Sequence, residues 1–84
     1  MTAFTKVVIA RNLHAVRERY PMMRTLEFRR EVLVVTEASW GRCIRGARVD
    51  PDAEIELIAP VYGAWVDGAM LEIRIAQRKV VRRD

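Results

Sequence analysis

The sequence predicts an α+β domain in which one short N-terminal helix packs on a mixed, mostly antiparallel sheet of about five short strands. The run Val32–Val35 is short, apolar and rich in β-branched residues. Glu54–Ile58 and Leu71–Ile75 alternate polar with apolar side chains, as half-buried strands do. The turn signals Asp50-Pro51-Asp52 and Asp67-Gly68 stand before these two runs. Residues 31–76 therefore hold the predicted sheet.

The length and composition indicate one domain. The chain has 84 residues, of which 51% are hydrophobic, enough to form a packed core. We expect a globular domain over residues 1–76 and a basic C-terminal tail over residues 77–84. A single cysteine excludes an intramolecular disulfide, and the N-terminus lacks the apolar segment of a signal peptide. We therefore expect a cytoplasmic protein without membrane contact.

Residues 4–10 are best interpreted as the first strand. They contain Val7-Val8-Ile9, and an unbroken helix from Phe4 to Tyr20 would place Phe4 and Val7 nearly opposite its apolar face. The preferred interpretation is a strand followed by a short helix that Asn12 caps and Pro21 ends. The single long helix remains the open alternative.

The later elements follow from the same patterns. The segment between the first strand and Val32 is long enough for a crossover that contains a helix. Arg42–Val49 lies between two strand-like runs, and Val61–Val66 is expected to pair with Met70–Ala76 across a turn. The predicted core consists of the apolar residues on the inner face of these strands: Val32, Val34, Ile55, Leu57, Ile73 and Ile75.

No catalytic or metal-binding pattern is present in the sequence. His14 is the only histidine and Cys43 the only cysteine, whereas a zinc site needs about four ligands. The acidic residues from Asp50 to Glu56 are better explained as the solvated face of a strand than as a metal or glycosidase site. Gly41-x4-Gly46 lacks the following Lys-Ser/Thr of a phosphate-binding loop. We therefore expect a protein that is not an enzyme and has no cofactor, metal or small-molecule substrate.

Charge is segregated along the chain. Residues 1–30 and 74–84 are basic, while residues 31–73 hold eight of the eleven acidic side chains. Such asymmetry is typical of nucleic-acid binding or of complementary surfaces that pair within or between subunits. Because thirteen of the fifteen basic residues are Arg, a GC-rich codon bias is a competing explanation. The candidate basic face consists of Arg17, Arg24, Arg29, Arg30, Arg78, Lys79, Arg82 and Arg83.

A second candidate surface combines an aromatic residue with the acidic strand. Its members are Trp40, Arg42, Asp52, Glu54 and Glu56. Trp40 follows Ser39 in an expected turn, where its indole either anchors a partner or covers the core. These features favour a non-enzymatic protein-interaction module, an accessory, regulatory or inhibitor-type protein for which self-association into a homo-oligomer is one option. The alternative is a small basic RNA- or DNA-binding domain.

Overall fold

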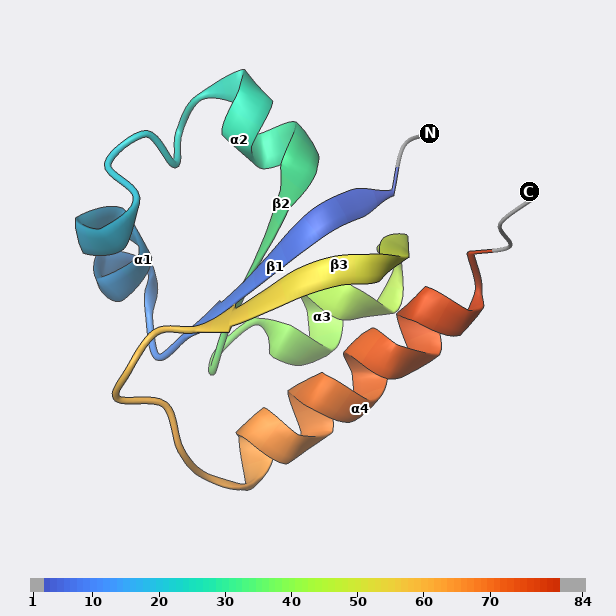
Figure 1. Ribbon diagram of the computed structural model, residues 1–84. Coiled ribbons are helices and arrows are strands. Elements are labelled where there is room, and N and C mark those ends of the chain that lie inside the picture. The colour runs from blue at the N-terminus through green and yellow to red at the C-terminus, as the bar shows by residue number, and fades with distance from the viewer. Residues whose placement is uncertain (1–2, 81–84) are drawn as a thin grey trace.

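The computed structural model describes residues 3–80, which form an α/β fold with three strands and four helices (Figure 1). The elements are β1 (Phe4–Ala10), α1 (Leu13–Arg19), α2 (Leu26–Glu31), β2 (Val32–Thr36), α3 (Trp40–Arg45), β3 (Val49–Leu57) and α4 (Ala64–Arg78). All strands are parallel, in the order β2-β1-β3. The predicted α+β fold with a mostly antiparallel sheet is therefore wrong.

The first strand of the chain is the centre of the sheet. Val8 of β1 pairs with Val34 of β2 on one side and with Glu56 of β3 on the other. Residues Val7–Ala10 are fully buried because helices cover both faces. A central parallel strand needs a continuous apolar run for this reason, and Val7-Val8-Ile9-Ala10 supplies it.

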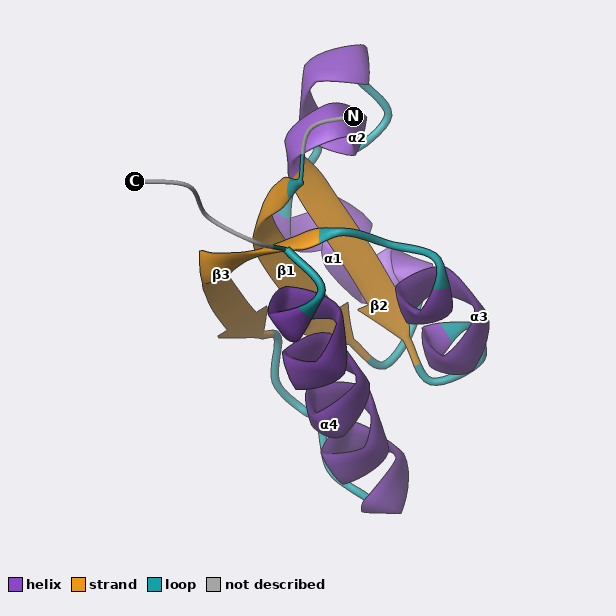
Figure 2. Cartoon of the chain, turned by 90° about the vertical axis from the view of Figure 1, so that its right-hand side faces the viewer, coloured by secondary structure: helices purple, strands orange, loops and turns teal. Residues whose placement is uncertain are grey.

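The two faces of the sheet are covered unequally (Figure 2). On one face, α3 and α4 close the larger core, in which Ile44 and Ile73 are among the largest fully buried side chains. On the other face, α1 contributes only Val16 as a buried residue. The six residues of α2 contribute none. The face under α1 and α2 is therefore the one left open for contacts.

The predicted elements of residues 4–20 are confirmed, whereas the second helix, α2, was not predicted. β1 spans the predicted residues 4–10, which excludes the single long helix. The side chain of Asn12 accepts a hydrogen bond from the backbone N–H of Ala15 at 3.0 Å, as an N-cap does. α1 ends at Arg19, one residue before the Tyr20–Pro21 pair. The parallel pairing of β1 with β2 confirms the predicted crossover.

The predicted hairpin over residues 61–76 is wrong, because residues 64–78 form the helix α4. Its buried residues, Ala69, Ile73 and Ala76, recur at intervals of three and four, which is the helical period. Asp67-Gly68 lies inside this helix and makes no turn. The alternating residues of Leu71–Ile75 do not share one face of the helix, since Ile73 is fully buried whereas Leu71 is exposed.

The expected turn at Asp50-Pro51-Asp52 is an irregularity within β3. Phe4 pairs with Val49 and Lys6 pairs with Glu54, so β3 has more residues than β1 between the two pairs. The backbone N–H of Asp52 donates to Asp50 Oδ1 at 2.8 Å, a local bond that replaces ladder pairing. The segment between β2 and β3 also differs from expectation, since Trp40–Arg45 forms α3.

The predicted core is only partly correct. Ile73 is fully buried and Ile55 is half-buried, but Leu57 and Ile75 are exposed. In β2 the buried residues are Leu33 and Val35, while Val32 and Val34 are half-buried. In β2 the cause is that successive side chains point to opposite faces of the sheet, and the well-covered face takes Leu33 and Val35 instead of Val32 and Val34.

The C-terminal boundary shifts as well. α4 runs through Arg78, so residues 77 and 78 are helical, and Gln77 Nε2 donates to the Asp50 carbonyl at 3.1 Å. Residues 81–84 of the predicted tail lie outside the described residues. Among residues 3–80, no helix has the length and apolar character needed to cross a membrane.

Candidate functional site

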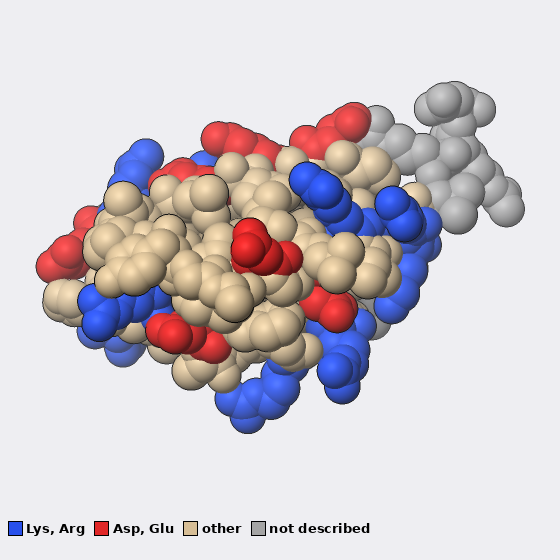
Figure 3. All heavy atoms as spheres, turned by 90° about the horizontal axis from the view of Figure 1, so that it is seen from below, with Lys and Arg blue, Asp and Glu red and all other residues tan. Residues whose placement is uncertain are grey.

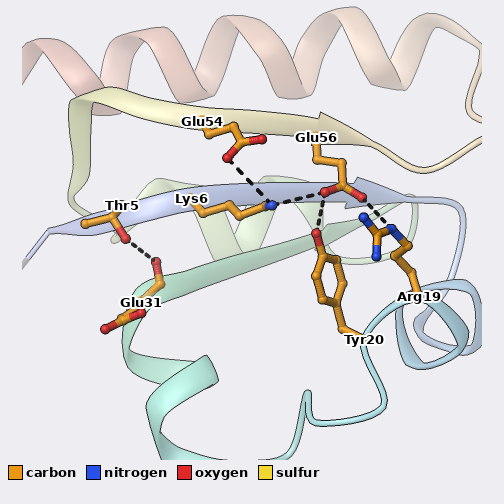
Figure 4. A network of polar contacts seen from close by, with 7 residues as sticks. All are labelled: Thr5, Lys6, Arg19, Tyr20, Glu31, Glu54 and Glu56. Carbon is orange, nitrogen blue, oxygen red and sulfur yellow. Dashed lines mark hydrogen bonds and ion pairs between the residues drawn. The ribbon is translucent and has the colours of Figure 1, made fainter.

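Glu56, a member of the predicted acidic sector, is held inside the subunit (Figure 4). Its carboxylate lies 3.1 Å from Lys6 Nζ and 3.4 Å from Arg19 Nε, and it accepts a hydrogen bond from the Tyr20 hydroxyl. Lys6 also lies 3.7 Å from Glu54. The cluster joins β1, β3 and the end of α1, so it ties α1 to the sheet.

The titration behaviour of this cluster follows from its contacts. The hydrogen bond from Tyr20, helped by Lys6 and Arg19, holds the pKa of Glu56 below its usual value. The hydrogen bonds of Lys6 with Tyr20 and Glu56 raise the pKa of Lys6. Acidic middle and basic flank thus pair within one subunit at this point, where Glu56 links β3 to β1 and to the end of α1.

Trp40 covers the core, which agrees with the second of its two predicted roles. Its indole packs against the larger core, and a Cβ built on Gly68 of α4 would lie 2.8 Å from Trp40 Cη2. Cys43, one turn further along α3, points its thiol at the Val34 carbonyl, 3.6 Å away. Burial raises the pKa of Cys43, which disfavours the reactive thiolate. Arg42 is exposed on the same helix.

The predicted basic face is divided by the sheet. Arg17 lies on α1, Arg24 in the α1–α2 loop, and Arg29 and Arg30 on α2, all on the less covered side. Arg78 and Lys79 lie at the end of α4, across the sheet from these residues. Arg82 and Arg83 lie outside the described residues. Viewed from the side that α4 covers, Lys and Arg gather mainly near the end where the described chain leaves α4 (Figure 3).

A groove follows the edge of β2, and two predicted basic residues line it. The groove has a volume of about 620 Å³. Arg24 and Arg29 are its charged residues, and neither forms an ion pair within residues 3–80. We call this surface the β2-edge groove; its lining consists of Phe4, Met23, Arg24, Phe28, Arg29, Val32, Leu33 and Val34.

The sequence analysis identified the arginines of this groove but missed its aromatic walls. Phe28 sits on a helix without buried residues, and its ring lies 5.3 Å from that of Tyr20. A signal was present, because Thr25 is a residue type that caps helices, and a helix that begins there leaves Leu26 exposed. Four of the six α2 residues are charged, but the exposed Leu26 and the half-buried Phe28 beside an edge strand indicate a contact surface.

Neither metal-binding side chains nor similarity to known proteins indicates a further site in the described residues. No group of three or more His, Cys, Asp or Glu side chains is placed to hold a metal ion in the described part of the chain. Comparisons with protein-family models, with curated proteins and with solved structures gave no match. The β2-edge groove and the charge distribution around it are thus the basis for a functional proposal.

Proposed function

We propose that the protein is a non-enzymatic interaction module that self-associates, with the β2-edge groove of one copy receiving the acidic edge of a second copy. The observation that carries the proposal is an apolar groove, flanked by two arginines without ion pairs, along an edge strand. Apolar surface of this kind gains free energy when it is covered. The arginines select a partner surface that is acidic.

The sheet supplies the matching surface at its other edge. Within the described residues, β2 and β3 each pair only with β1, so each has one free edge. Free edges of sheets commonly add strands from another chain. On β3, the side chain of Glu54 is 73% exposed, which offers a carboxylate to the groove.

Such an assembly joins two different surfaces, so it is heterologous. A heterologous contact closes into a ring or continues as an open chain of subunits. The mean mass should therefore rise with protein concentration beyond that of a dimer. Screening weakens attraction between exposed charges as the Debye length falls from ~30 Å at 0.01 M salt to ~10 Å at 0.1 M. Association should accordingly decline with salt.

Sedimentation velocity of the full chain at several salt concentrations tests the proposal. Arg24→Glu with Arg29→Glu should abolish association, and Glu54→Lys alone should weaken it. Arg17→Glu with Arg45→Glu is the matched control, because it changes net charge equally outside the groove. Thermal unfolding of every variant checks that the fold is retained.

Mixing the variants gives the sharpest result. Glu54→Lys protein retains an intact groove, and the Arg24→Glu, Arg29→Glu protein retains an intact acidic edge. An equimolar mixture should therefore associate more strongly than either component does alone. A wild type that is monomeric at every salt concentration, or a control pair that dissociates equally, would refute the edge-to-edge contact.

Nucleic-acid binding is the second candidate, favoured by the placement of arginines at helix ends. Arg29 and Arg30 occupy the last turn of α2, Arg45 that of α3 and Arg78 that of α4. Basic side chains stabilise the negative C-terminal end of a helix, which accounts for this placement without a ligand. The same groups, in a chain of pI near 10, can also contact phosphates.

Fluorescence anisotropy with labelled single- and double-stranded oligonucleotides separates the two candidates. Under the nucleic-acid candidate, affinity falls steeply with salt, and Arg29→Ala with Arg30→Ala lowers the salt slope by up to about two. Glu54→Lys should then tighten binding, whereas it weakens self-association. Absence of binding at low salt would exclude this candidate.

A further inference from the structure

A second cavity lies at the carboxyl ends of the strands, away from the β2-edge groove. Its volume is about 190 Å³. Arg11 directly follows β1, Glu37 directly follows β2, and Pro60, Val61, Tyr62 and Trp65 come after β3. The carboxyl ends of parallel strands meet at one edge, so three connections that are distant in sequence converge on this cavity (Figure 1).

The strand order makes this edge of the sheet a typical position for ligand binding. From β1 the chain passes to β2 on one side, and β3 then pairs on the other side of β1. In open parallel sheets, ligands bind outside the carboxyl ends of the strands where the connections diverge in this way. Arg11 stands at that point, immediately after the central strand. The cavity therefore coincides with the place where this type of sheet forms a binding crevice.

Two opposite charges line the cavity without neutralising each other. Arg11 and Glu37 are both exposed, and neither forms an ion pair, with the other or elsewhere, in the described residues 3–80. A guanidinium binds a carboxylate through two parallel hydrogen bonds, and a carboxylate accepts hydrogen bonds from an ammonium. One ligand that carries both charges would satisfy both side chains.

An aromatic pair completes the lining. Tyr62 is 78% exposed, and Trp65 is partly buried against the larger core. Gly63 has a φ of 117°, a conformation that favours glycine, and a Cβ there would lie 3.3 Å from Trp65 Cδ1. The turn thus places both rings at one cavity, where they can pack on an apolar side chain.

The size of the cavity narrows the ligand class. Pockets for drug-sized molecules measure roughly 300–1,000 Å³, so this cavity suits a smaller molecule than a nucleotide. We propose that it binds a free α-amino acid with an aromatic or branched side chain. Arg11 holds the carboxylate, Glu37 holds the ammonium group, and Tyr62 and Trp65 contact the side chain. This site is separate from the proposed assembly surface and does not depend on it.

Isothermal titration calorimetry of the full chain with three related compounds tests the assignment. L-phenylalanine carries both charges, L-phenylalaninamide lacks the carboxylate, and 3-phenylpropionate lacks the ammonium group. Each analogue should bind about tenfold or more weakly than the amino acid, since each loses a charge-assisted contact. L-leucine and L-tyrosine extend the test to other side chains, and AMP tests for a nucleotide.

The variants assign each charge to its residue. Arg11→Gln should remove the preference for phenylalanine over the amide, and Glu37→Gln should remove the preference over 3-phenylpropionate. Arg45→Gln and Glu27→Gln, which lie outside the cavity, should keep both preferences. The Arg24→Glu, Arg29→Glu protein should also still bind phenylalanine, which separates this result from the test of self-association.

Several results would overturn the site. Absence of any heat or thermal shift with phenylalanine, leucine and tyrosine at millimolar concentration would exclude it. Binding of AMP in preference to amino acids would replace the assigned ligand class. Equal loss of selectivity in the two control variants would show that the cavity charges do not contact the ligand.

Discussion

Substitution of Gly68 by alanine provides the most direct test of the packing between α3 and α4. Gly68 lies inside α4, and a Cβ there would stand 2.8 Å from Trp40 Cη2 and 3.2 Å from Trp40 Cζ3. Alanine favours a helix interior over glycine by about 1 kcal/mol. Overpacking a core contact costs about 1–3 kcal/mol. The balance predicts that Gly68→Ala destabilises the protein by about 1 kcal/mol.

A double-mutant cycle with Trp40→Phe isolates the contact. The shorter phenylalanine ring lacks the atoms that meet the new methyl group, so Gly68→Ala should be neutral or stabilising in that background. The coupling should fall within about 0.5–3 kcal/mol, the range for residues in contact. Urea denaturation followed by circular dichroism measures it without relying on the fluorescence of Trp40.

Gly41→Ala is the matched control in α3. A Cβ at Gly41 meets nothing within 4 Å, so the helix-propensity gain of up to about 1 kcal/mol should appear in full. If Gly68→Ala stabilised the wild type as much as Gly41→Ala, the indole of Trp40 would not rest on α4. The interpretation of Trp40 as an exposed partner anchor would then be the correct one.

Three further outcomes are expected. Tyr20→Phe should raise the pKa of Glu56 toward its ordinary value in a carboxyl NMR titration, and an unchanged pKa would contradict the hydrogen bond. The lowered pKa of Glu56 stabilises the fold at pH values above the ordinary pKa, and this contribution is lost as the pH falls. The variant should therefore lose less stability than the wild type on acidification. Ile73→Ala, at a fully buried site, should cost about 2–5 kcal/mol in urea unfolding, and Ile75→Ala clearly less because Ile75 is 38% exposed; equal costs would contradict the helix register. Asn12→Ala should cost about 1 kcal/mol through loss of the cap, whereas Asn12→Asp should retain most of the stability.

The sequence allowed the N-terminal part of the fold to be predicted because its signals are local. Three adjacent β-branched residues mark β1, and Asn12 and Pro21 mark the bounds of α1. The direction of the strands was not predicted correctly, since alternation in β3 has the same appearance in parallel and antiparallel sheets. Gly68 was interpreted as a turn residue, yet its small size serves a close approach to Trp40.

The candidate sites were harder to predict for a related reason. Arg24 and Arg29 were identified from charge, but the β2-edge groove also needs residues from β1 and α2 whose proximity depends on the parallel sheet. Arg11 and Glu37 were overlooked because each is an unremarkable charge in the sequence. Their position directly after a strand becomes informative only when the strands are known to be parallel, since their ends then meet.

The position of β1 at the centre of the sheet has a consequence for synthesis on the ribosome. Of the three strands, β1 is made before the others, but it gains its second neighbour only when β3 has emerged, since Val7 pairs with Ile55. Its apolar face is covered last, by α4, whose Ile73 belongs to the same core cluster as Val7. Such non-local pairing is slow to form. A nascent chain that ends before β3 should therefore expose its most apolar strand, which makes it a substrate for chaperones that bind extended apolar segments.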